Sequence, residues 1–234
     1  MLDPFLIPYG VSSLDARQVD ICDGHIRCPA PYIFIDTERN EILRLNSGQY
    51  GFPEAPDLRA MTDAKAQLEF LCEHLYQYCD LWARPPKLFL ESYFTFIGEQ
   101  VAENQAQLAK KLAPYGSLFS VSDWALSAPR PLPRAQIKVG KTYWPVDFAF
   151  WLGDRIVALV LKGSETTTMA DLKRISSLKK YGVDMIELNV DELMQAGAQC
   201  LERNFDVEFV SFWEGETMPS SPFKGTSLDD IIRA

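Results

Sequence analysis

The chain has 234 residues, of which 47% are hydrophobic and 12% aromatic, so it can bury a sizeable core. Its net charge of −9 argues against a protein that wraps nucleic acid around most of its surface, and no apolar run approaches the roughly eighteen residues of a membrane span. The N-terminus lacks the basic start and small-residue cleavage site of a signal peptide, and the odd number of cysteines, five, favours reduced thiols over a disulfide framework. We therefore expect a soluble cytoplasmic protein with no membrane partner.

The first part of the chain predicts a small β-rich and helical region. Residues 31–46 alternate as two β-prone runs around a polar turn, which is typical of a hairpin. Residues 63–82 place apolar side chains at helical spacing, and Arg84-Pro85-Pro86 interrupts that helix. We take these prolines as the boundary between an N-terminal hairpin and helix region, residues 1–86, and an α/β core, residues 87–234.

The second part alternates helical and strand patterns, which predicts an α/β fold with a central mixed sheet flanked by helices. A long helical stretch opens it, three strands follow in close succession, and a helix leads from the third strand to a fourth. A further helix and a last strand close the pattern. The predicted helices are 90–112, 166–182 and 191–204, and the predicted strands are 136–140, 142–152, 155–162, 183–189 and 207–213.

The hairpin of residues 145–163, PVDFAFWLGDRIVALVLKG, carries two charged side chains on otherwise apolar strands. Asp147 lies between Val146 and Phe148, where an ionised and unpaired carboxylate costs several kcal/mol to bury. It therefore needs a partner, and Lys162 at the end of the second strand is the obvious one. An Asp147–Lys162 ion pair without any chemistry is one interpretation of this hairpin.

The hairpin also resembles the motif of the PD-(D/E)xK, or restriction-endonuclease-like, nuclease superfamily. Pro145-Val146-Asp147 is similar to its first half, and Val160-Leu161-Lys162 to its second half, with Val160 in place of the second acid. In that superfamily the two acids hold Mg²⁺, while the lysine orients or activates the attacking water and stabilises charge on the phosphate. The resemblance thus implies a restriction-endonuclease-like core with a nuclease site at Asp147 and Lys162.

The similarity continues downstream in the order seen in the very-short-patch-repair-type branch of the superfamily and covers about residues 90–200. The N-terminal ninety residues are not explained by it. The matching positions are Gly163, Asp171-Leu172-Lys173-Arg174, Leu178, Tyr181-Gly182, Met185 to Leu188 and Asp191-Glu192-Leu193.

Val160 cannot supply an oxygen ligand, and a single carboxylate would hold Mg²⁺ or Mn²⁺ weakly. In some members of the superfamily the missing acid comes from the adjacent helix, which makes Glu165 and Asp171 the candidates to join Asp147 as metal ligands. Family members also often carry a glutamate on the first core helix, for which Glu99 or Glu103 would serve. Alternatively, the site is inactive and the fold is retained as a binding module.

The segment from residue 134 to 182 holds nine basic residues and four acidic ones in an otherwise acidic chain. This basic segment is compatible with a local phosphate-facing surface, although lysines on an amphipathic helix are often simply solvated. Three hypotheses follow: a metal-dependent endonuclease acting on DNA, an inactive nuclease-fold module that binds nucleic acid or a protein partner, and an acidic interaction domain with a purely structural ion pair. The resemblance adds the expectation of a homodimer.

Overall fold

The structure is a computed structural model of the whole chain. The residues that it describes are 5–10, 12, 20–22, 25–27, 31–36, 41–45, 64–80, 84–115, 119–139, 141–152, 155–163, 169–214 and 219. Glu165, one of the predicted site residues, lies outside them.

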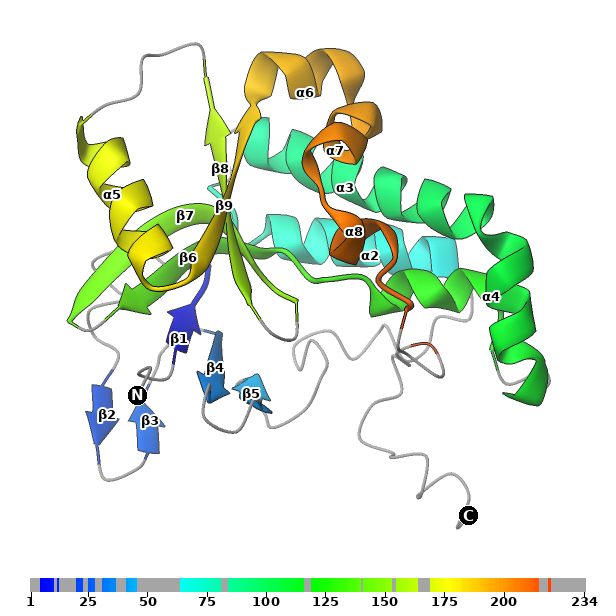
Figure 1. Cartoon of the computed structure of the whole chain (residues 1–234), viewed down its shortest axis with the longest axis horizontal. Helices are drawn as coiled ribbons and strands as arrows, with labels where there is room; N and C mark the ends of the chain where they lie inside the picture. Colours follow the sequence, from blue (N-terminus) through cyan, green and yellow to red (C-terminus); the bar gives the residue numbers. More distant parts are fainter. Residues whose placement is uncertain are drawn as a thin grey trace.

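A seven-stranded mixed sheet forms the centre of the described molecule, with the strand order β5-β4-β1-β6-β7-β8-β9 (Figure 1). Neighbouring strands are antiparallel except β8 and β9, which are parallel and joined by a helical crossover, as parallel pairing requires. A separate pair, β2 and β3, forms a small second sheet. The strands are β1 (Phe5–Pro8), β2 (Asp20–Cys22), β3 (His25–Arg27), β4 (Tyr32–Asp36), β5 (Glu41–Leu45), β6 (Leu132–Val139), β7 (Thr142–Trp151), β8 (Ile156–Lys162) and β9 (Val183–Asn189).

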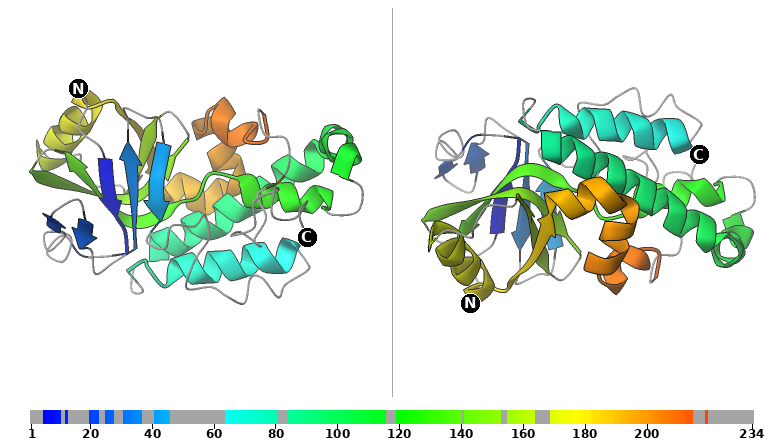
Figure 2. Two further views of the ribbon diagram at one scale, coloured as in Figure 1. Left: turned by 90° about the horizontal axis from the view of Figure 1, so that it is seen from below. Right: turned by 90° about the horizontal axis from the view of Figure 1, so that it is seen from above.

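Helices cover both faces of the sheet (Figures 1 and 2). The crossover helix α5 lies on one face, while α2, α3 and the helices after β9 lie on the other. The helices are α2 (Ala64–Tyr76), α3 (Arg84–Glu103), α4 (Gln105–Leu112), α5 (Met169–Lys180), α6 (Val190–Ala196), α7 (Ala198–Asn204) and α8 (Val207–Val210), with 3₁₀ turns η2 (Ala113–Tyr115) and η3 (Val121–Ser127).

The alternating side chains of β7 and β8 divide the core into two layers. Phe148 and Leu159 belong to the cluster on the α3 side, whereas Ala149 and Ala158 belong to the cluster on the α5 side, together with Leu178 of α5. Aromatic rings dominate the first layer: Phe148 lies 4.5 Å from Phe89 of α3, measured between ring centroids. Both faces of the central strands are therefore buried, which explains why their sequences are almost continuously apolar.

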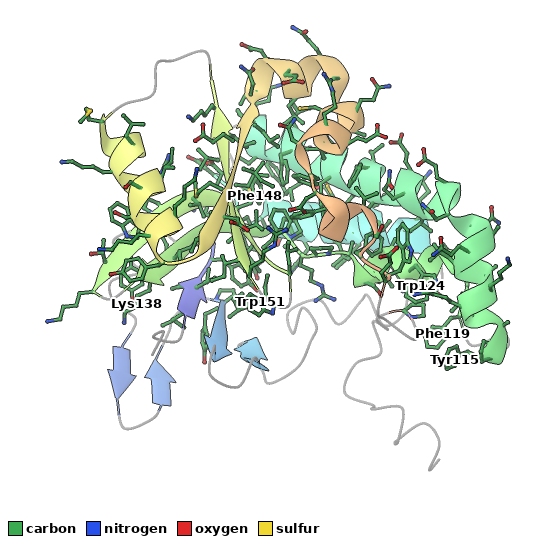
Figure 3. All side chains as sticks on the ribbon, viewed as in Figure 1. Tyr115, Phe119, Trp124, Lys138, Phe148 and Trp151 are labelled. Atoms are coloured by element: carbon green, nitrogen blue, oxygen red, sulfur yellow. The ribbon has the colours of Figure 1, made fainter. Side chains whose placement is uncertain are left out.

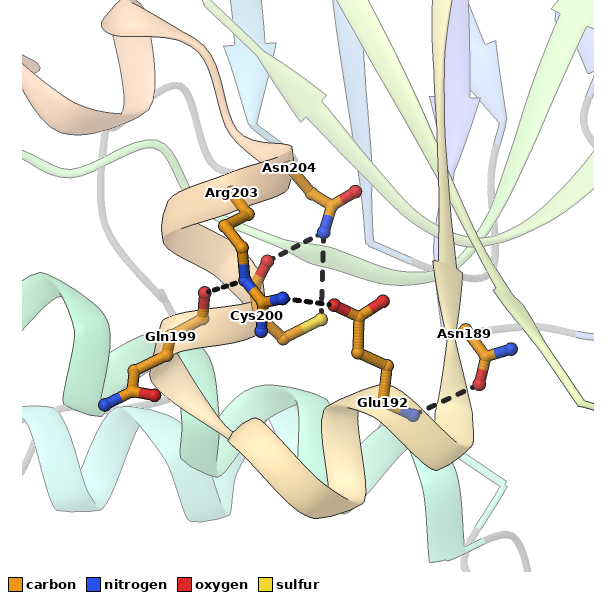
Figure 4. Close-up of polar contacts among 6 residues, drawn as sticks. All are labelled: Asn189, Glu192, Gln199, Cys200, Arg203 and Asn204. Carbon is orange, nitrogen blue, oxygen red and sulfur yellow. Dashed lines mark hydrogen bonds and ion pairs between the residues drawn. The ribbon is translucent and has the colours of Figure 1, made fainter.

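Side-chain contacts hold the helical corner that follows β9 (Figure 4). Asn189 Oδ1 accepts hydrogen bonds from the backbone N–H groups of Asp191 and Glu192, at 2.8 and 3.1 Å, and so caps α6. Figure 4 shows the bond from Glu192. The Glu192 carboxylate pairs with Arg203 of α7 at 3.1 Å. The corner thereby fixes the direction of the chain just beyond the end of β9.

The sequence pattern predicted most of these elements, including the hairpin of β4 and β5, the strands β6 to β9 and the helix α5. Its predicted mixed α/β sheet flanked by helices is confirmed. The prolines at 85 and 86 lie in the first turn of α3, where proline is well tolerated. The N-terminal region and the predicted core share one sheet, because β1 pairs with β6.

The predicted strand over residues 207–213 is wrong. Residues 207–210 form the short helix α8 instead, and Phe209 and Trp213 are buried among the side chains that the structure describes there. Phe209 of α8 and Trp213 of the following turn both belong to the α3-side cluster, so tertiary packing overrides the β propensity of the valines and aromatics.

Candidate functional site

The strands β7 and β8 separate at one end, and we call this opening the fork. The ladder between them runs from the Trp151–Ile156 pair to the Phe148–Leu159 pair. Beyond that point β7 stays paired with β6 as far back as Thr142, while β8 stays paired with β9 as far as Lys162. The fork therefore opens between Asp147 on one strand and the end of β8 on the other.

Asp147 lies at the base of the fork. Its Oδ2 accepts a hydrogen bond of 2.8 Å from the backbone N–H of Leu161, a group that the β7–β8 ladder no longer reaches. The side chain takes over the role of a strand carbonyl at the position where the two strands part. This contact gives the half-buried carboxylate the partner that its apolar surroundings require.

Burial raises the pKa of Asp147 above its ordinary value, although the Leu161 hydrogen bond and the positive charge of Arg174 both act in the opposite direction. Arg174 comes from α5, and its Nη1 donates to the carbonyl of Pro145 at 3.3 Å. The crossover helix thus holds a cation against β7 at Pro145, two residues before Asp147. The net effect is a carboxyl group that binds its proton more tightly than an exposed aspartate does.

Lys162 forms an ion pair with Glu187 of the neighbouring strand β9. The side chains of Lys162 and Glu187 are 26% and 36% exposed, so both are accessible at the open end of the sheet. In the parallel β8–β9 ladder, Glu187 is the register partner of Val160. The row in which the nuclease motif would place its second acid therefore holds valine on β8 and a glutamate on the next strand.

Sequence reasoning found two residues of this site and missed the third. Asp147 and Lys162 lie at the fork, as expected from their adjacent strands. Asp171 lies on α5, one turn before Arg174, and Glu165 is not among the described residues, so the predicted pairing of these acids with Asp147 stays a prediction. The overlooked residue, Glu187, is an acid within the strand VDMIELN, and a parallel register between β8 and β9 would have placed it beside Val160.

The donor set at the fork consists of oxygen atoms. Within the described part of the chain, no group of three or more His, Cys, Asp and Glu side chains is placed to hold a metal ion. Two carboxylates, Asp147 and Glu187, lie on β7 and β9 on either side of β8. Mg²⁺ is commonly held by one or two carboxylates together with water and substrate phosphate, so this pair suits Mg²⁺ or Mn²⁺ in chemistry but makes an incomplete site by itself.

The basic segment is divided between the core and the surface. Lys173, Lys179 and Lys180 are exposed on α5, and Lys138 lies over the ring of Tyr143 at the tip of the β6–β7 hairpin, 5.5 Å from the ring centroid (Figure 3). Phe148, in contrast, is fully buried, as expected for aromatic residues on core strands. The lysines of α5, exposed Lys141 and the partly exposed Lys162 are therefore accessible cations of this segment that could contact phosphates.

None of the helices in the described ranges is long and apolar enough to cross a membrane. Comparison of the chain with protein-family models, with curated proteins and with solved structures gives no match.

Proposed function

We propose that this protein is a metal-dependent phosphodiester hydrolase with a restriction-endonuclease-like core, acting on DNA. The observation that carries the proposal is the fork, which brings a half-buried aspartate on β7, a lysine at the end of β8 and a glutamate on β9 to one end of a mixed sheet. The order of elements, α3, then β6, β7 and β8, then α5 and β9, supports the same assignment.

In this proposal Asp147 and Glu187 hold one Mg²⁺ or Mn²⁺ ion, and Asp171 or Glu165 complete the oxygen set. A bound cation of this kind supplies Lewis-acid stabilisation of phosphate charge. Lys162 neutralises Glu187 in the free protein and would face the scissile phosphate, where its ammonium group stabilises the charge that develops during hydrolysis. The exposed lysines of α5 would hold the DNA backbone.

The test combines calorimetry with Mg²⁺ and Mn²⁺ and a plasmid-nicking assay on the same samples. We expect the wild-type protein to bind the cation and nick the plasmid, and Asp147→Ala to lose both. Glu187→Gln should bind the cation at least about 10-fold more weakly, since it loses a charged oxygen ligand. Lys162→Ala should keep cation binding and lose nicking by about 100-fold or more, as expected for a group that stabilises the transition state.

Glu202→Gln is the matched control, because Glu202 is an exposed carboxylate on α7, outside the fork. It should change neither readout. A wild-type protein that binds neither cation, or an Asp147→Ala variant that nicks as well as wild type, would overturn the proposal.

A second candidate function is favoured by the ion pair and the hydrogen bond already present at the fork. Asp147 is bonded to Leu161 and Glu187 to Lys162, so both carboxylates have partners without a cation. This arrangement suits an inactive nuclease-fold module that binds nucleic acid or a protein. For that function we expect the protein to bind DNA with an affinity that falls steeply as the salt concentration rises. We also expect it to bind no divalent cation.

A further inference from the structure

A groove of about 800 Å³ runs between α2 and α3, on the helical side of the molecule and away from the fork. We call it the α2–α3 groove. Its floor is apolar and is built from both helices and from η3. The floor residues are Leu68, Cys72, Phe94, Gly98, Val101 and Ala125.

The floor is open at Gly98, in the interior of α3. A Cβ atom built at this position would meet no atom within 4 Å. Glycine inside a helix lowers stability by about 1 kcal/mol relative to alanine, so nothing in helix formation favours it here. An absent side chain at this point keeps the middle of the groove clear.

Glutamates line both banks of the groove. Glu69 and Glu73 come from α2, and Glu91 and Glu99 come from α3. Within the described residues, Glu73 and Glu99 form no ion pair, while Glu69 and Glu91 have only long contacts, of 3.8 Å with Lys65 and 3.9 Å with Lys87, between exposed side chains. Lys65 also lines the groove, so four glutamates face one lysine there. The groove therefore combines an apolar floor with a net negative rim.

Acids from both helices act electrostatically on Cys72, which lies in the floor between them. After burial itself, the charges of Glu91 and Glu73 are the largest influences that raise the pKa of the Cys72 thiol, to about 11. One of these glutamates lies on each helix. A ligand on the floor would thus lie between two negative banks.

We propose that the α2–α3 groove binds a basic amphipathic helix of a partner protein. An amphipathic helix lays its apolar face into such a groove, and lysine or arginine residues beside that face would meet the glutamates of both banks. The chain itself offers no basic segment of this kind among its longer undescribed parts: residues 46–63 carry three acidic residues and one basic, and residues 220–234 carry two of each. Charge complementarity therefore points to another polypeptide.

The probe is a fluorescent synthetic helix of about 18 residues, or roughly 27 Å, with leucine on one face and lysine on both flanks. Its control is a peptide of the same composition whose order abolishes the apolar face. Fluorescence anisotropy with the full chain should show binding of the amphipathic peptide that is at least about 10-fold tighter than binding of the control peptide.

Two variants locate the site. Gly98→Leu fills the floor and strengthens the helix propensity of α3, and Glu73→Lys/Glu99→Lys reverses the charge of one residue on each bank. Each should weaken binding about 10-fold or more, while Glu202→Lys, on exposed α7, should leave it unchanged. Circular dichroism of each variant reports whether the fold is retained.

Three results would overturn the proposal. The two peptides could bind equally, which would mean that lysine charge alone is recognised. Both groove variants could bind as tightly as Glu202→Lys does. The wild-type protein could also self-associate without any peptide and lose that association in Gly98→Leu, which would make a second copy of the chain the occupant.

Discussion

At the scale of single residues, the ionised side chain of Asp147 lowers the stability of the folded protein. Burial raises its pKa, so the folded state binds this proton more tightly than the unfolded state, whose value is near 3.8. The stabilising contribution of the protonated form is complete below that value and is lost as the pH rises through the higher folded pKa. At neutral pH the ionised carboxylate therefore lowers the free energy of unfolding, by about 1.4 kcal/mol for each unit of pKa elevation.

Asp147→Asn removes this cost and keeps an oxygen that accepts the Leu161 hydrogen bond. We expect the variant to be more stable than wild type at pH 7 and the difference to disappear below about pH 4. Urea unfolding across this pH range measures it. Asp123 is the control, since its exposed carboxylate also accepts a backbone N–H, from Ser120 at 2.6 Å. Stabilisation by Asp123→Asn of the same size, or none by Asp147→Asn, would contradict the explanation.

The residues of the fork were only partly predictable. Asp147 and Lys162 could be predicted as site residues because each is a charged side chain on an otherwise apolar strand, where burying a charge costs free energy. Glu187 lies on a strand that exposes several side chains, so its charge alone did not indicate a functional role. Its relation to Val160 depends on strand pairing across a crossover helix, and that long-range register is not encoded in either strand alone.

At the scale of elements, the end of β9 is coupled to the start of α6 through Asn189. This residue is the register partner of Lys162 and also the N-cap of α6. Asn189→Ala should lower the free energy of unfolding by about 1 kcal/mol, because two backbone N–H groups lose their acceptor. Asn189→Ser restores a capping oxygen and should recover most of the loss in chemical denaturation. Equal destabilisation by both substitutions would rule out capping as the role of Asn189.

The predicted ends of helices and strands agree with the structure where a strong local signal marks them, and they are wrong where tertiary packing sets them. The helix predicted over 191–204 is two helices, α6 and α7, because Gly197 adopts a positive φ of 51° between them. The helix predicted over 90–112 is interrupted at Asn104, whose side-chain nitrogen bonds back to the carbonyl of Gln100 at 2.9 Å. Both breaks let a following helix turn back onto the core, which is a tertiary requirement that periodicity does not express.

At the scale of the whole molecule, the fork depends on strands and helices from both ends of the chain. β6, which holds β7 open at the fork, is itself paired with β1 on its other side. Leu75 of α2 and Cys79, in the turn after α2, belong to the same buried cluster that contains Phe89 and Phe148. We therefore expect the described structure to unfold as one cooperative unit, although the sequence suggested a boundary near residue 86.

A chain that begins at residue 84 tests this expectation. Removing residues 1–83 would expose the edge of β6 and uncover the face of α3 that α2 now covers, which includes apolar core residues. We expect thermal unfolding of the full chain, followed by circular dichroism, to show one sharp transition, and the shortened chain to show a broad one or none. A shortened chain that melts as sharply as the full chain and still shows dispersed amide signals would establish residues 84–234 as an independent domain. The N-terminal region would then be an accessory to the fork, and Asp147 and Lys162 would remain in place without it.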